Sequence, residues 1–207
     1  MFRNLLKPDS PLMITMSQIT DCIFLSLFWL VGCFPLVTVG VSTAAMYDAT
    51  YHGLRKGDKH SWQRFWGSFR RNLKSGILPG ILLLIALFCG AWGMIQVWNS
   101  AVYGEISWAV FSAAAIIAVF LLGMISVLCP MLSRFENSVS QLLKNTVLLS
   151  LANPARTLLL GIVNAVAIFL CVRYIFPLFF LPSLAALIGS LFIEPMFKPY
   201  MNTEDAA

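Results

Sequence analysis

Long apolar runs are the feature that most restricts what this chain can fold into. They extend over residues 19–41, 76–98, 106–132 and 157–172. Each run is long enough, or nearly so, for a helix to cross the hydrocarbon core of a bilayer, which is about 30 Å thick. The chain has 207 residues, of which 59% are hydrophobic and only 11% charged, with a mean hydropathy of +0.82. This composition excludes a soluble domain of ordinary type and predicts an all-α transmembrane protein.

Two further segments are weaker candidates for crossings. Residues 174–193 are apolar but contain Pro177 and Pro182, and proline removes a backbone donor and clashes with the preceding turn. We therefore expect one crossing to end near residue 176 and a short final helix to follow the second proline. Residues 42–56 would make a helix of only about 23 Å, and they include polar side chains. This segment can cross only inside a bundle, where neighbouring helices would shield Asp48 and Thr50.

The basic residues decide between five and six crossings, because Lys and Arg gather in cytoplasmic loops. If residues 42–56 cross, every Lys and Arg except Arg173 lies on one side of the membrane. If they do not, Arg3 and Lys7 lie opposite the basic loop that follows. We favour six crossings in one transmembrane domain over residues 1–207, with five as the alternative and both termini in the cytoplasm. The predicted crossings are residues 12–35, 42–56, 76–98, 106–131, 157–176 and 183–193.

A signal peptide is the competing interpretation of the first apolar run. The run is too long for one, and no small-residue cleavage site is followed by a soluble region, so we interpret it as a retained helix. The five cysteines lie inside apolar runs without a C-x-x-C pair. They are predicted to be small packing residues rather than metal ligands or disulfides.

The segment 61–74 is predicted to form an amphipathic cytoplasmic helix. Its apolar face has helical spacing and consists of Trp62, Phe65, Trp66, Phe69 and Leu73. The other faces carry Arg64, Arg70, Arg71 and Lys74. This pattern is typical of a helix in the membrane interface, with aromatic rings at headgroup depth and cations near anionic lipid. The aromatic residues Trp62, Phe65, Trp66 and Phe69, with the cations Arg70, Arg71 and Lys74, therefore form either a lipid anchor or a docking surface for another membrane protein.

A second amphipathic cytoplasmic helix is predicted over residues 133–147, and it is far less basic. Each of the two segments precedes an apolar run that leads away from the cytoplasm. The shared order hints at two repeated halves, and repeats in membrane proteins often frame a central cavity.

The residues between the first two predicted crossings indicate a tight outer hairpin. Pro35 can end the first helix, and Gly40 can supply a backbone conformation that other residues avoid. Thr38 lies between them, and Ser42 or Thr43 can cap the returning helix.

Ionisable and amide side chains at membrane depth are functional candidates by default. Asp48 is predicted either to stabilise the bundle through hydrogen bonds or to line a cavity. Asp21 is predicted to lie level with Arg55 and to form a structural ion pair with it. Asn164 and Gln96 could join Asp48, since amides bridge helices in bilayers.

No catalytic motif is present in the sequence. It has no G-x-S-x-G elbow, no G-x-x-x-x-G-K phosphate loop and no H-E-x-x-H pair, so we expect neither an enzyme nor a cofactor. His52, Asp58 and His60 imitate a metal site, but the neighbouring cations would repel a divalent metal ion. The net charge of +5 is spread beside the crossings, which favours the lipid bilayer rather than nucleic acid as a partner.

The stretch from Pro35 to Tyr47 reads P-x-x-T-x-G-x-x-x-A-A-x-Y. Together with Phe65, Phe69 and Asn72 it resembles the YesL-like family of small bacterial integral membrane proteins. The resemblance implies a multi-pass protein of the bacterial cytoplasmic membrane, associated with ABC-type carbohydrate uptake systems and without an established enzymatic activity. Two functions stay open: an accessory or regulatory partner of the permease subunits, or a small independent transporter or channel that works alone or as a homo-oligomer.

Overall fold

The computed structural model describes residues 11–58, 60–134 and 138–200. Within these residues the chain forms seven α-helices and no strand, which confirms the all-α prediction. The α-helices are α2 (Pro11–Cys33), α3 (Val39–Thr50), α4 (Ser61–Val102), α5 (Trp108–Arg134), α6 (Val139–Ala152), α7 (Pro154–Arg173) and α8 (Leu181–Phe197). Short 3-10 helices cover Leu36–Thr38, Phe176–Phe179 and Lys198–Tyr200, and a π-helical turn covers Tyr51–Arg55.

Four helices are long and apolar enough to cross a membrane, namely α2, α4, α5 and α7. The helix α8 is apolar but shorter. These helices fit a multi-pass membrane protein. Six crossings, and the side on which the termini lie, stay predictions.

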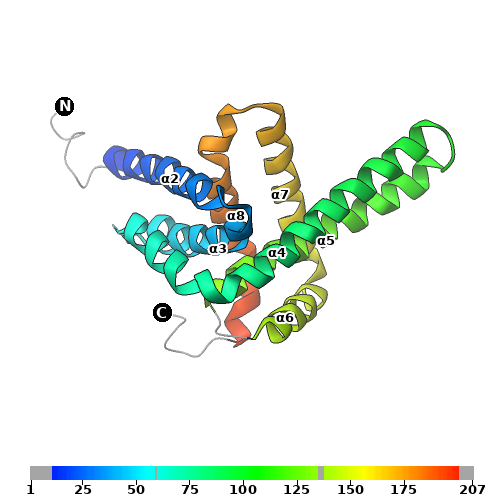
Figure 1. Ribbon diagram of the computed structural model, residues 1–207. Helices are drawn as coiled ribbons and strands as arrows, with labels where there is room; N and C mark the ends of the chain where they lie inside the picture. The colour runs from blue at the N-terminus through cyan, green and yellow to red at the C-terminus, as the bar shows by residue number, and fades with distance from the viewer. Residues whose placement is uncertain (1–10, 59, 135–137, 201–207) are drawn as a thin grey trace.

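The molecule divides into a base and an arm (Figure 1). We define the base as residues 39–56, 61–83, 123–134 and 183–197, which belong to α3 with the turn after it, the start of α4, the end of α5 and most of α8. We define the arm as residues 84–118, the rest of α4 and the antiparallel start of α5. The arm extends away from the base as a pair of helices, and α7 leaves α5 in another direction.

Glycines allow α3 and α4 to approach each other closely in the base. A Cβ atom added to Gly40 would lie 2.6 Å from the Cα atom of Gly80, so only glycine fits. Four residues earlier on α4, a Cβ atom on Gly76 would meet Val41 and Leu132. The G-x-x-x-G spacing of α4 therefore serves packing against α3.

A second glycine pair lies where α5 crosses α7. A Cβ atom on Gly123 would overlap the carbonyl group of Thr157, and one on Gly161 would overlap the carbonyl group of Val119. This crossing is the point from which the arm and α7 diverge.

The structure differs from the prediction at residues 61–98. The expected interfacial helix 61–74 and the expected crossing 76–98 are one continuous helix of 42 residues, with Pro79 inside it. Pro79 does not end the helix, because Gly76 is packed against Val41 of α3 and this contact holds α4 together beside the proline. The second amphipathic segment does form a separate helix: Asn153 ends α6 and Pro154 begins α7. A capping box between Ser138 and Gln141 starts α6, and residues 135–137 of the predicted segment lie outside the described residues.

The α2–α3 turn packs beside the middle of α4. The turn lies beside Gly80, whereas α4 continues for 22 further residues to Val102, about 33 Å along the helix. The prediction placed two turns on the same side of the membrane: the one between α2 and α3, near residue 40, and the one between α4 and α5, near residue 103. Their separation along α4 is close to the thickness of the hydrocarbon core, and the side of the membrane that each turn faces stays a prediction. Sequence shows which segments can cross, but not where along a long helix a hairpin packs.

Candidate functional site

A tight turn joins α2 to α3 at the predicted residues Pro35, Thr38 and Gly40. The Oγ1 atom of Thr38 donates to the carbonyl oxygens of Gly32 and Pro35, at 2.6 Å each. Gly40 does not have the expected special backbone conformation, since the described residues with positive φ are Gly57 and Gly104. Gly40 is needed instead for the close contact with Gly80. The side of the membrane that this turn faces stays a prediction.

Ser42 and Thr43 bind α2 instead of capping α3. The Oγ atom of Ser42 donates to the carbonyl oxygen of Trp29 at 3.0 Å. The indole N–H of Trp29 donates to Thr43 at 3.1 Å. The hairpin therefore positions α3, and with it the polar residues that follow.

Asp48 is buried on α3 and lies among three basic side chains. Its Oδ1 atom is 3.1 Å from Nδ1 of His52, in the next turn. Its Oδ2 atom is 3.7 Å from Nε of Arg64 and 3.8 Å from Nη2 of Arg71, both on α4. The local sequence offers only His52 and Arg55, so the two α4 partners could not be predicted without knowing the helix pairing.

Glu194 on α8 forms a second buried ionic contact, which the sequence analysis missed. Its Oε1 atom accepts hydrogen bonds from Nη2 of Arg134 at 2.8 Å and from the hydroxyl of Tyr47 at 2.9 Å. Only 5% of Glu194 is exposed. One feature of the sequence could have indicated this pair: Arg134 and Glu194 are ionisable residues that each lie near the end of an apolar segment.

Tyr51 lies between the contacts of Asp48 and those of Glu194. Its ring stacks parallel to that of Tyr47, with 6.4 Å between centroids. The guanidinium carbon of Arg134 lies 4.4 Å from the Tyr51 ring centroid, and Arg55 and Lys56 each lie 5.5 Å away. We call this set the charged cluster: Tyr47, Asp48, Tyr51, His52, Arg55, Lys56, Arg64, Arg71, Arg134 and Glu194.

The loop after the π-helical turn closes the cluster. Gly57 has a φ of 78°, which permits the turn, and Asp58 follows it. The backbone N–H of His60 donates to Asp58, and Arg64 also bonds this carboxylate, at 3.2 Å. These contacts, led by the His60 N–H, lower the pKa of Asp58. Among the described residues, no group of three or more His, Cys, Asp or Glu could hold a metal ion.

The predicted intramembrane polar residues do not form one site. Asp48 contacts Arg71, and Gln96 lies 25 residues further along α4, about 37 Å away, exposed on the arm. Asn164 donates to the carbonyl oxygen of Leu160 in its own helix. Within the described residues Asp21 has no ion pair with Arg55, whose Nη1 atom donates to the Ser190 carbonyl at 2.9 Å instead.

The predicted docking residues are partly enclosed by the fold. Phe65 is fully buried, and Trp66 and Phe69 pack against the cluster of apolar residues from α2 and α3. Trp62 is 55% exposed, and Arg70, Arg71 and Lys74 are exposed too, although Arg71 also reaches Asp48. The aromatic face of residues 61–74 therefore attaches α4 to α2 and α3. Sequence periodicity identified this face but not what covers it.

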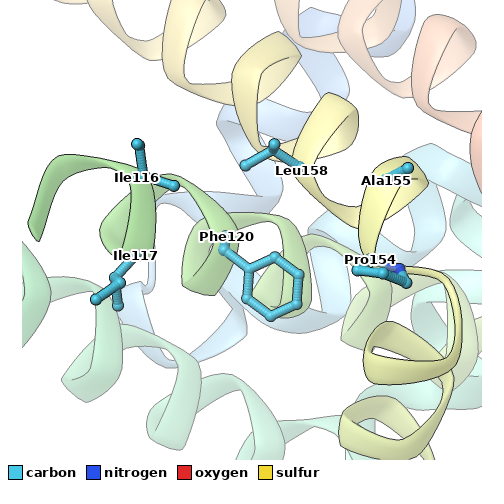
Figure 2. A pocket seen from close by; sticks show the side chains of 6 residues that line it. All are labelled: Ile116, Ile117, Phe120, Pro154, Ala155 and Leu158. Carbon is cyan, nitrogen blue, oxygen red and sulfur yellow. The ribbon is translucent and has the colours of Figure 1, made fainter. Parts of the chain in front are cut away.

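An apolar groove lies where the arm meets α7. Its volume is about 350 Å³. Figure 2 shows its lining, which comes from α5 and from the first turns of α7: Ile116, Ile117, Phe120, Pro154, Ala155 and Leu158. The groove offers shape and apolar contact but no polar group for catalysis.

Residues 22–93 match the model of a family described as a protein of unknown function, DUF624. The matched segment is about a third of the chain and covers the second half of α2, the hairpin, α3 and α4 as far as residue 93 in the arm. No curated protein and no solved structure matches the chain.

Proposed function

We propose that this chain is a non-enzymatic integral membrane protein that acts by binding another membrane protein. The arm carries this proposal. Of residues 84–118, Ala101 alone is buried, so the two helices are covered only where they face each other. A helix pair that contacts nothing else leaves most of its surface available to the helices of a partner.

The ends of the arm suggest how it lies in the membrane. Trp98, Trp108 and Phe111 form an aromatic cluster at its tip, with ring centroids 5.5 to 6.2 Å apart. Such clusters favour the membrane–water interface. From residue 84 to residue 102 the helix rises about 27 Å, close to the hydrocarbon thickness. The arm would thus cross the bilayer with its apolar side chains exposed.

Open glycines and the apolar groove support a helical partner. Gly90 and Gly93 have no atom within 4 Å of the position that a Cβ atom would take, so this side of α4 is free for a second helix. The groove at the root of the arm, lined by α5 and α7, is a second apolar surface. Small residues and an apolar groove permit the close approach by which helices associate in bilayers.

The partner we propose is the permease of an ABC-type carbohydrate uptake system in the bacterial cytoplasmic membrane. The support is the resemblance of residues 35–47 to the YesL-like family. The DUF624 match covers the same hairpin and the start of the arm, so these two regions share a sequence pattern with other proteins.

Transport by the chain alone is the second candidate. The buried charged cluster favours it, because ionisable groups of membrane proteins often mark ion or substrate pathways. It predicts that Asp48→Asn abolishes flux in reconstituted vesicles. Absence of flux with both proteins would remove this function.

The test of partner binding is affinity purification of the tagged protein from its native membrane after crosslinking, with mass spectrometry of the recovered proteins. We expect stoichiometric recovery of permease subunits, and about tenfold less for Gly90→Leu with Gly93→Leu. Gly67→Leu is the matched control, because Gly67 is also open but lies in the base. Recovery of the chain alone would contradict the proposal.

A further inference from the structure

Three cationic side chains surround the ring of Tyr51. Arg134 approaches from α5, with its guanidinium carbon 4.4 Å from the ring centroid. Arg55 and Lys56 approach from the π-helical turn, each at 5.5 Å. The wide turn brings both of them to one ring, because the N–H of Lys56 bonds the Tyr51 carbonyl five residues earlier, at 3.2 Å. Each cation is attracted to the face of the ring, but the three positive charges also repel one another.

Only one of these three cations has an acidic partner among the described residues. Arg134 pairs with Glu194 at 2.8 Å. Arg55 donates to the neutral carbonyl and hydroxyl groups of Ser190, and Lys56 takes part in no ion pair within the described part of the chain. The Nε atom of Arg134 is also buried there without a hydrogen-bond acceptor. The site thus has two unmatched positive charges and one unused buried donor.

We propose that the cations around Tyr51, namely Arg55, Lys56 and Arg134, bind the phosphate group of an anionic phospholipid. A phosphate supplies negative charge and several acceptor oxygens, which match guanidinium and ammonium donors. The inference does not depend on partner binding by the arm, since it concerns the base.

The surroundings favour a lipid over a soluble phosphate. The site lies at the ends of the apolar helices α5 and α8, where a headgroup would meet the protein. On α4, which adds Arg64 and Arg71 to the charged cluster, Trp62 is 55% exposed, and Arg70 and Lys74 are exposed as well. An exposed indole with flanking cations is typical of a segment at headgroup depth. Anionic lipids are attracted to such basic surfaces.

The experiment titrates the full chain, purified in a neutral detergent, with phosphatidylglycerol and counts bound lipids by native mass spectrometry. We expect Arg55→Gln with Lys56→Gln to weaken binding about tenfold, because charge-assisted hydrogen bonds are lost. The control pair Arg70→Gln with Lys74→Gln removes the same charge from α4 and should weaken binding less than about twofold. Lys56→Gln alone carries the test if the double variant does not fold, because among the described residues the Lys56 side chain contacts only the ring of Tyr51.

Three results would overturn the proposal. Equal weakening by both pairs would show a diffuse attraction to the basic surface rather than a site. Equal binding of phosphatidylcholine would show that the negative charge is not recognised. Displacement of phosphatidylglycerol by inorganic phosphate at an equal concentration would assign the site to a soluble phosphate instead of a lipid.

Discussion

The arm and the base share the helices α4 and α5 but differ in what surrounds them. In the base, α4 packs backbone to backbone on α3, and polar side chains from α3, α4, α5 and α8 contact one another. In the arm, α4 faces α5 alone, and large apolar side chains such as Phe88 and Trp92 are exposed. The difference indicates that the base determines stability, and it leaves the arm as the surface for which we propose partner binding.

The largest effect on stability should come from Glu194 in the base. Glu194→Ala leaves Arg134 buried without its carboxylate, which typically costs about 3–5 kcal/mol. Thermal unfolding of the purified protein in detergent measures it. Glu105→Ala is the control, because Glu105 is exposed in the turn of the arm and, within the described part of the chain, its carboxylate bonds only Ser100. Its effect should stay within about 0.5 kcal/mol. Equal losses of stability in the Glu194 and Glu105 variants would contradict the claim that the base, and not the arm, determines stability.

Matched glycine substitutions compare the two regions on a single helix. Gly80→Leu forces a side chain against the backbone of Gly40 and should cost about 1–3 kcal/mol. At Gly90 a Cβ atom would have no atom within 4 Å, so Gly90→Leu should not lower the free energy of unfolding while it weakens partner binding. A Gly90 variant as unstable as the Gly80 variant would show that the arm is packed.

The hairpin should respond more weakly to the loss of one hydroxyl. Thr38→Val removes the hydrogen bonds to Gly32 and Pro35 and should cost about 1 kcal/mol in denaturant unfolding. Thr20→Val provides the comparison, since among the described residues this exposed hydroxyl bonds only the Met16 carbonyl, one turn earlier in its own helix. A smaller loss at Thr38 than at Thr20 would mean that the turn does not help to hold α3.

The smallest effect concerns the loop at Asp58 and depends on pH. Because contacts in the folded state lower the pKa of Asp58, its stabilising contribution is present above the usual aspartate pKa and is lost as the pH falls through the folded value. Hydrogen exchange of the loop, corrected for intrinsic rates, should increase below about pH 4. Asp58→Asn should remove this dependence on pH, and an unchanged profile would assign it to another group.

The same comparison explains what could be predicted from the sequence. The apolar runs identified the four long helices, including both helices of the arm, because length and composition suffice for a segment exposed to lipid. The contacts of Asp48 with Arg64 and Arg71, and of Glu194 with Arg134, could not be predicted in the same way. They join residues that are distant in sequence, and periodicity within one helix says nothing about which helix lies beside it.

The two amphipathic segments illustrate the limit of local patterns. Both precede an apolar run, yet the first is continuous with it in α4, whereas Asn153 and Pro154 separate the second into α6 and α7. The proline in α4 does not end the helix, because contacts of Gly76 and Gly80 with α3 hold the segments on both sides of it. A proline therefore predicts a break only where no such packing opposes it.

Site-specific photocrosslinking in the native membrane tests partner binding by the arm most directly. A photoreactive phenylalanine replaces Phe88 on the arm or Phe169 on α7, which are 71% and 66% exposed and differ mainly in the helix that carries them. We predict a protein adduct of one discrete mass at Phe88, containing a second membrane protein, and no protein adduct at Phe169. Lipid adducts alone at both positions, or the same protein adducts at both, would contradict the assignment of the arm as the binding surface.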